Sequence, residues 1–263
     1  MHGANKLAQN QADSNSIINQ SSNLNDKQKQ ALNDLINHAQ TKQQVAEIIA
    51  QANKLNNDMG TLKTLVEEQS KVHQQSKYIN EDPQVQNIYN DSIQKGQEIL
   101  NGTTDDVLNN NKIADAIQNI QLTKNDLHGE QKLQKAQQDA NNELNYLTNL
   151  NNSQRQSEHD EINSAPSRTE VSNDLNHAKA LNEVMRQLEN EVALENSVKK
   201  LSDFINEDES AQNEYSTALQ KAKDIINGVP TSTIDKATIE GALLELQNAR
   251  ESCLLYTSDA ADE

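Results

Sequence analysis

The fold is decided by residues 41–66, which read TKQQVAEIIAQANKLNNDMGTLKTLV. Apolar residues recur in this stretch at alternating intervals of three and four, the spacing of a heptad seam along one face of a helix. No Gly-Pro pair or cluster of turn residues interrupts the pattern, so we expect one continuous helix over residues 41–79. The seam comprises Val45, Ile48, Ala52, Leu55, Met59, Leu62 and Val66.

A helix of this length would extend about 57 Å at 1.5 Å per residue, which is more than one small bundle needs. We therefore predict that its first half packs in one three-helix bundle and its second half in the next. Because three helices already bury such an apolar stripe, we expect the seam to be covered within the chain, which would then be a monomer.

The seam returns 126 residues later. When the chain is shifted against itself by 126 residues without a gap, about a third of positions 4–126 match their counterparts, so the chain is a tandem repeat. Copying a unit end to end increases length, reach and the number of weak contacts, whereas an active site gains little, so we expect no enzyme. The second seam comprises Val171, Ala178, Leu181, Met185, Leu188 and Val192, with Asp174 replacing one apolar residue.

A shorter helix is predicted over residues 83–100. Asp82 can cap its start, and Pro83 suits the first helical position because that residue needs no N–H partner. Asn101 and Gly102 can close the helix in a left-handed conformation.

Two more helices are expected in each copy. Asn109 and Asp235 are N-cap candidates for a later helix, which in the first copy continues to about Leu147 with Gly129 as the expected bend. Another short helix is predicted from about Asp26 to Gln40.

These patterns predict an all-α fold of tandem three-helix bundles, joined by long shared helices into an elongated rod. Residues 1–3 and 253–263 fall outside the useful repeat match, and we interpret them as ends added to the repeats. The predicted bundles are residues 4–58 and 59–128 in the first copy and residues 129–184 and 185–252 in the second, with residues 253–263 as a tail.

Composition narrows the possible functions. The formal net charge of -17 repels phosphate backbones and anionic lipid, so we expect no nucleic-acid partner, and no apolar run is long enough for membrane insertion. With no Trp and one Phe, the core must be thin and a deep pocket is not expected. The single cysteine, Cys253, lies in the predicted tail.

The sequence predicts no catalytic, cofactor-binding or metal-binding residues, and the ligand-binding residues are unknown. Six histidines are present, and no two of them stand at an i, i+4 helical spacing with a carboxylate as a further ligand, so we expect surface side chains and no metal site. They are His2, His38, His73, His128, His159 and His177, and His38, His73, His159 and His177 have no histidine at the equivalent repeat position. The acidic clusters at residues 80–82 and 206–208 lack the alternating Asp pattern and the glycine of a calcium loop, so we interpret them as helix caps.

Two segments of each copy resemble known modules. Residues 36–45 and 162–171 are similar to the junction between helices 2 and 3 of albumin-binding-type three-helix modules. The segment after the seam resembles the companion module of Gram-positive surface repeats. This second resemblance is carried by Tyr89, Lys95, Ile99, Asn101, Gly102, Ile113 and Ala116.

Alternation of these modules with a 126-residue period resembles the giant extracellular-matrix-binding surface proteins of staphylococci, over nearly all of residues 4–252. The resemblance implies a cell-wall-associated rod and adhesin that contacts host matrix proteins such as fibronectin. We expect such contacts to be weak and multivalent.

The alternative is a dedicated module for serum albumin or another host protein. Albumin-binding relatives use exposed apolar and aromatic residues on helix 2. Here residues 26–40 contain no aromatic, and their copy carries Glu158, His159 and Glu161, so we expect no anchor for tight binding in either copy.

Overall fold

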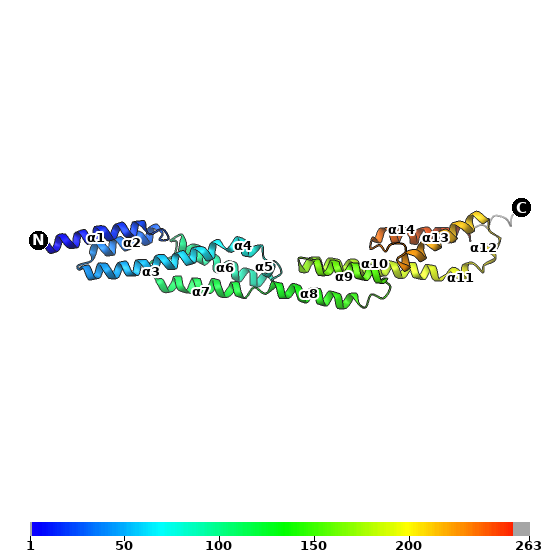
Figure 1. Ribbon diagram of the computed structural model, residues 1–263, viewed down its shortest axis with the longest axis horizontal. Helices are drawn as coiled ribbons and strands as arrows, with labels where there is room; N and C mark the ends of the chain where they lie inside the picture. The colour runs from blue at the N-terminus through cyan, green and yellow to red at the C-terminus, as the bar shows by residue number, and fades with distance from the viewer. Residues whose placement is uncertain (1, 255–263) are drawn as a thin grey trace. The chain divides into compact units, whose positions relative to one another are not determined.

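The computed structural model describes residues 2–254, and all regular structure in that range is helical. The chain divides into two compact units, residues 1–131 and 132–263 (Figure 1). The all-α prediction is confirmed. No helix among the described residues combines the length and apolar character that a membrane crossing requires.

The first unit is organised around its longest helix, α3 (Lys42–Glu67). This helix packs against α1 and α2 and also against α6 and α7 (Figure 1). One helix is therefore shared by both halves of the unit, as the seam predicts. The other helices are α1 (His2–Gln20), α2 (Asp26–His38), α4 (Gln69–His73), α5 (Ser76–Ile79), α6 (Pro83–Leu100) and α7 (Asn110–Asn125).

The second unit repeats this plan, with α10 (Arg168–Ala193) in contact with α9, α13 and α14. Its first helix, α8 (Gly129–Leu144), begins at the end of the first unit. The remaining helices are α9 (Asn152–Ser164), α11 (Glu195–Val198), α12 (Ser202–Asn206), α13 (Glu209–Asn227) and α14 (Lys236–Ser252).

The seam forms the core of each unit. In the first copy, every seam residue except the partly buried Ile48 is at most 8% exposed. In the second copy, Leu175 is buried one position after Asp174, and Val192 is partly buried. The prediction that the chain covers its own seam is confirmed.

The predicted continuous helix over residues 41–79 is wrong in its second part. Helix α3 ends at Glu67, and the chain turns at Gln75, which is extended with ψ 145°. The turn brings Tyr78 onto the ring of His73, with ring centroids 4.2 Å apart, and against the buried Tyr89 at 6.2 Å. A continued helix would forgo these aromatic contacts, which stabilise the turn beyond simple burial.

The predicted helix from residue 110 to about 147 is also interrupted. Helix α7 ends at Asn125, Leu127 is buried, and α8 starts at Gly129. The break thus lies immediately before the glycine that we expected to bend the helix. Helix α1, which precedes the first seam, was not among the predicted helices.

The helix-end predictions are mostly confirmed. Gly102 and Gly228 have φ of 64° and 69°, the left-handed conformation that glycine adopts without strain. The Asn109 and Asp235 side chains cap α7 and α14. Asp82 stands at the N-cap position of α6, but its side chain makes no capping hydrogen bond.

Cys253 belongs to the fold, contrary to its assignment to the tail. It is fully buried, packs in the core of the second unit, and stands 126 residues after the buried Leu127. Its thiol donates to the Ala211 carbonyl at 3.3 Å, and burial raises its pKa. Residues 255–263 of the predicted tail lie outside the described residues.

Candidate functional site: the module junctions and the helix surfaces

A polar junction joins the two halves of the first unit at the start of α2. The Asn25 side chain accepts from the Gln28 backbone N–H at 2.9 Å, and the Gln28 side chain accepts from the Asn25 N–H at 3.0 Å. This reciprocal capping box satisfies two N–H groups that an isolated helix start leaves unpaired. It also fixes both side chains for a second set of contacts.

The same two side chains reach the far half of the unit. Asn25 Nδ2 donates to the Ile99 carbonyl at 3.2 Å, and Gln28 Nε2 donates to the Val107 carbonyl at 3.0 Å. Gln28 is 1% exposed, so losing its partners would leave buried polar groups unpaired. We call Asn25 and Gln28, with their counterparts in the second copy, the module latch.

The second unit contains the same latch. Asn151 and Gln154 form the capping box, Asn151 Nδ2 donates to the Ile225 carbonyl at 3.3 Å, and Gln154 Nε2 donates to the Thr233 carbonyl at 2.9 Å. Helical periodicity does not predict this latch, because its partners are far apart in the sequence. A signal was present, because Asn25 and Gln28 are identical in both copies although most neighbouring polar positions differ.

A second polar anchor explains the acidic cluster at residues 80–82. Glu81 is 4% exposed; its Oε1 accepts from the Asp82 N–H at 2.8 Å and its Oε2 from the His128 N–H at 2.5 Å. A Cβ on Gly129 would lie 2.5 Å from both the Glu81 N and the Lys77 O. The cluster therefore holds the chain segment after α7, and the capping interpretation is wrong for the Asp82 side chain.

The histidines are spread over different structural settings. His73 contacts Asn90 Oδ1 at 2.8 Å through Nε2, His38 Nδ1 lies 2.7 Å from the Asp34 carbonyl, and His177 Nδ1 lies 2.9 Å from Glu158 Oε1. Within residues 2–254, no group of three His, Cys, Asp or Glu side chains is placed to hold a metal ion.

The two central tyrosines, Tyr89 and Tyr215, are fully buried at equivalent positions. Burial raises the pKa of Tyr89 to about 12, and burial also raises the pKa of Tyr215. Both phenols therefore stay neutral at physiological pH and act as core residues.

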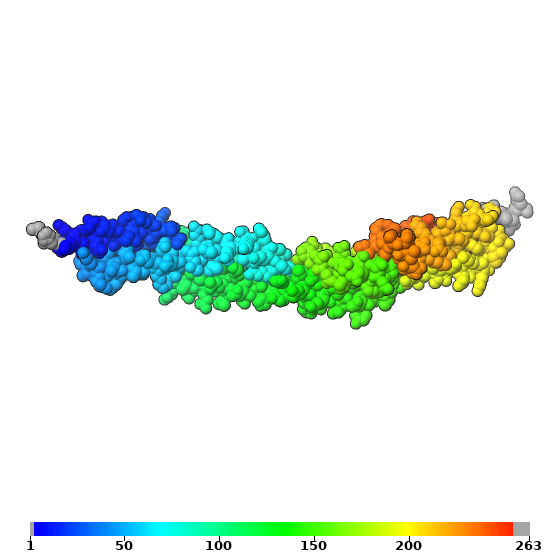
Figure 2. All heavy atoms as spheres, viewed as in Figure 1, coloured from blue at the N-terminus to red at the C-terminus, as the bar shows by residue number. Residues whose placement is uncertain are grey.

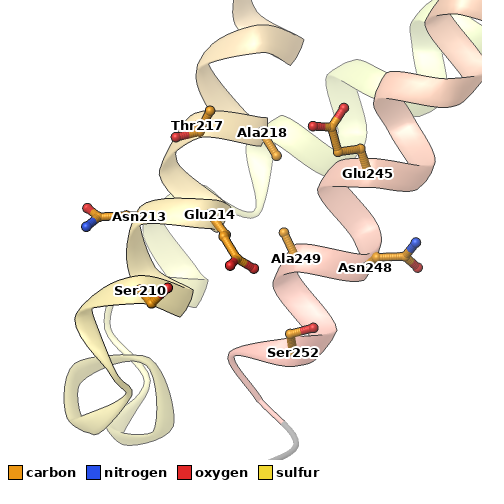
Figure 3. A pocket seen from close by; sticks show the side chains of 9 residues that line it. All are labelled: Ser210, Asn213, Glu214, Thr217, Ala218, Glu245, Asn248, Ala249 and Ser252. Atoms are coloured by element: carbon orange, nitrogen blue, oxygen red, sulfur yellow. The ribbon is translucent and has the colours of Figure 1, made fainter.

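The interface between the last two helices differs between the two units. In the second unit, α13 and α14 enclose an open groove of about 540 Å³ (Figure 3). Ala218 and Ala249 form its narrow part, and Glu214 points into it (Figure 3). At the matching positions of the first unit, Ser92 and Thr123 hydroxyls lie 2.8 Å apart and close the helix interface.

A groove of about 390 Å³ lies between α2 and α3 of the first unit. Leu35 lines it and is 44% exposed, with Ile48 and Ala39 beside it. The absence of an anchor for tight binding stays a prediction, and this copy exposes one aliphatic side chain of helix 2, Leu35. In the second copy, Glu161 replaces Leu35, and Glu158 lies in the core and not on the surface.

On the face seen in Figure 2, the described parts of each unit are closely packed and show shallow relief only.

The chain matches two family models in alternation. The GA module matches residues 4–58 and 130–184, and the FIVAR domain matches residues 58–128 and 184–252. The latch therefore connects a GA-matching segment to a FIVAR-matching segment in each unit.

Among curated proteins, the chain is 38% identical over 252 residues to the extracellular matrix-binding protein ebh of Staphylococcus aureus strain MRSA252, covering 96% of this chain and 2% of that protein. It is equally similar to the extracellular matrix-binding protein EbhA of S. aureus strain N315, of which it covers 4%. The chain thus spans a few per cent of the length of these relatives. A crystal structure of the 756–1003 domain of S. aureus EbhA matches with a TM-score of 0.69 at 24% identity, covering 74% of this chain and 77% of that one, which shows a shared fold.

Proposed function

The chain belongs to the FIVAR-domain family, and from this premise we propose that it is a repeat segment of a cell-wall-associated bacterial surface protein. In this proposal the segment acts as an elongated rod and as an adhesin toward host extracellular matrix. The observation that carries the proposal is the alternation of GA and FIVAR matches in a chain similar to matrix-binding proteins of Staphylococcus. The proposed role needs no catalytic site.

The rod part of the proposal is supported by the internal construction of each unit. Helix α3 or α10 runs through both halves, and the module latch ties the halves together a second time. Two connections between halves resist bending better than one linker. We propose three-helix bundles at residues 4–58, 59–128, 129–184 and 185–252 as the mechanical elements.

The adhesive part is supported by the surfaces. Both units expose apolar side chains, and these belong to different segments: Ile17 lies on α1, Ile88 on α6, Leu201 before α12 and Leu244 on α14. Single apolar side chains give weak contacts, and many repeats of a weak contact give strong attachment through avidity. We propose that matrix proteins such as fibronectin are bound in this weak, multivalent way by a monomeric chain.

Surface plasmon resonance with the full chain tests adhesion. The chain is immobilised at sparse and at dense coverage, and soluble fibronectin is passed over both surfaces. We expect little saturable binding at sparse coverage and slow release at dense coverage. Tight saturable binding at sparse coverage would contradict the multivalent proposal and would indicate a dedicated receptor site.

Small-angle scattering of the same sample tests the proposed rod. A maximum dimension typical of a globule of this mass would contradict it.

One observation favours a second candidate, a host-protein site in the groove between α2 and α3 of the first unit. Exposed Leu35 supplies an apolar contact there that the second unit lacks. If serum albumin or another host protein binds at this groove, Leu35→Glu should abolish binding, because Glu is the residue of the second copy. Leu244→Gln is the matched control, since Leu244 is also exposed and its counterpart is Gln118. Equal losses in both variants would exclude a site at this groove.

A further inference from the structure

The two units differ most sharply at one core position on their second helices. Leu32 is fully buried on α2, and its counterpart on α9, 126 residues later, is Glu158, which is 1% exposed. A carboxylate thus occupies a position that the first copy fills with an aliphatic side chain. Burying an ionised carboxylate is unfavourable unless its oxygens are well paired.

The pairing of Glu158 is incomplete. Its Oε1 lies 2.9 Å from His177 Nδ1, whereas its Oε2 is buried without a hydrogen-bond partner among the described residues. His177 is partly exposed and stands where the first unit has Gln51. The exchange of Leu for Glu is therefore accompanied by an exchange of Gln for His at the contacting position.

Other charges around the pair are mostly negative. Glu161 on α9 and Asp174 on α10 both raise the pKa of Glu158, and Glu170 raises that of Asp174. Lys179 of α10 is engaged by Glu143 of α8 at 2.5 Å, and Arg155 of α9 donates to the Leu144 and Leu150 carbonyls. From the loop before α14, Asp235 interacts electrostatically with His177.

We propose that the Glu158–His177 pair makes the contact between α9 and α10 pH-sensitive, so that the first bundle of the second unit tightens on mild acidification while the matching bundle of the first unit does not. With an ionised Glu158 carboxylate and a neutral His177 ring, the pair carries one negative charge, and the carboxylate that bears it is buried. Uptake of a single proton neutralises the pair whether the carboxylate or the imidazole receives it. The source of the effect is thus the pair as a whole.

The direction of the pH dependence follows from linkage. Burial raises the pKa of Glu158, with His177 opposing the shift, and burial together with Glu161 raises the pKa of Asp174. For a carboxyl group whose pKa is higher in the folded state, the folded state binds the proton more tightly than the unfolded chain. Stability then rises as the pH falls through the folded-state pKa and levels off below the unfolded value.

Hydrogen exchange on the full chain tests the proposal, with α2 as an internal reference for α9. Amide protection, corrected for intrinsic exchange, is measured between about pH 7.5 and pH 5. We expect protection in α9 to rise severalfold more than in α2, because protonation removes the charge from a buried carboxylate whose Oε2 has no hydrogen-bond partner among the described residues. Equal changes in the two helices would overturn the proposal and would point to a general response of an acidic chain.

Two variants at Glu158 separate the pair from the other acids. Glu158→Leu installs the residue of the first copy and suits a core position, and Glu158→Gln keeps the shape but cannot titrate. Both should make the pH dependence of α9 equal to that of α2. A pH dependence of α9 that persists in both variants would overturn the proposal. The double variant Leu32→Glu with Gln51→His places the same pair in the first unit, and amide protection in α2 should then become pH-dependent. If the pH dependence of protection in α2 does not change, the Glu–His pair is not the source of the effect.

Discussion

The two units share most of their apolar seam and the module latch but differ at most other positions. Six of the seven seam positions, the central tyrosines and the module latch are identical, although about two thirds of aligned positions differ. Counted with neutral His, residues 1–131 carry a formal charge of -5 and residues 132–263 one of -12. The architecture therefore depends on a narrow stripe and a few polar contacts, which leaves the exposed faces free to change.

Exchanges of exposed apolar side chains run in both directions. In the second unit, exposed apolar residues replace polar ones at Tyr146, Leu194, Leu201, Val229 and Leu244, whose counterparts are Gln20, Glu68, Gln75, Thr103 and Gln118. Four exposed apolar side chains of the first unit are replaced by acidic or amide side chains in the second. They are Ile17, Leu35, Ile88 and Leu122, and their counterparts are Glu143, Glu161, Glu214 and Asn248. A ligand that contacts apolar side chains would thus distinguish the units, whereas the fold would not. Substitutions at equivalent positions of the two units test which positions the fold depends on.

The largest effect is expected where the two copies begin. Gly129 and Gly3 are equivalent by the 126-residue repeat. A Cβ on Gly129 would lie 2.5 Å from backbone atoms of Lys77 and Glu81, whereas a Cβ on Gly3 would have no neighbour within 4 Å. Gly129→Val should therefore lower the free energy of unfolding of the first unit by about 3 kcal/mol, because overpacking against backbone cannot be relieved by rotating a side chain. Chemical denaturation of the full chain measures the change.

Gly3→Val is the matched control and should have almost no effect on stability. The prediction also requires loss of the hydrogen bond from the His128 N–H to Glu81, seen as faster exchange of that amide in Gly129→Val only. Equal stability of the two valine variants would mean that the segment after α7 is not anchored by the loop between α5 and α6.

The next largest effect concerns the module latch. Gln28→Ala removes half of the capping box and the bond to the Val107 carbonyl, so we expect a loss of about 2 kcal/mol from a missing cap and unpaired buried groups. Gln154→Ala should cost the same in the second unit, since the latch is equivalent there. Thermal unfolding of each variant measures the two losses. A loss confined to one unit would show that the latch is not a common feature of the repeat.

Periodicity predicted the helices well because it reports burial along a single helix. The seam, helix α6 and the glycine caps all followed from spacing within one segment. The latch could not be found this way, because Gln28 and Val107 are 79 residues apart and only the fold brings them together. The turn at Gln75 was missed for the same reason, since it depends on a contact between Tyr78 and Tyr89.

The burial of Glu158 was the feature least accessible to sequence reasoning. The residue pattern placed Glu158 among exposed helix-2 residues, whereas the structure places it in the core. A polar residue at an apolar heptad position is ambiguous, because the helix can rotate slightly or the residue can be buried with a partner. Aligning Glu158 with Leu32 through the repeat would have resolved this ambiguity.

The smallest effect is expected at the interface between the last two helices of the first unit. Ser92 and Thr123 share a hydrogen bond of 2.8 Å where the second unit has Ala218 and Ala249 beside an open groove. Replacing both by Ala should lower stability by less than about 1 kcal/mol, since a paired hydrogen bond adds little net free energy and both partners are removed together. Each hydroxyl also donates to a backbone carbonyl of its own helix, Ser92 to Tyr89 and Thr123 to Asn119. The two single variants should therefore lose a similarly small amount of stability.

A double-mutant cycle from denaturant unfolding gives the coupling energy between Ser92 and Thr123. Asn248→Ala in the second unit controls for a change outside the hydrogen bond. A coupling well above 1 kcal/mol would show that this bond holds α6 to α7, and the two units would then differ in the stability of their cores as well as in their surfaces.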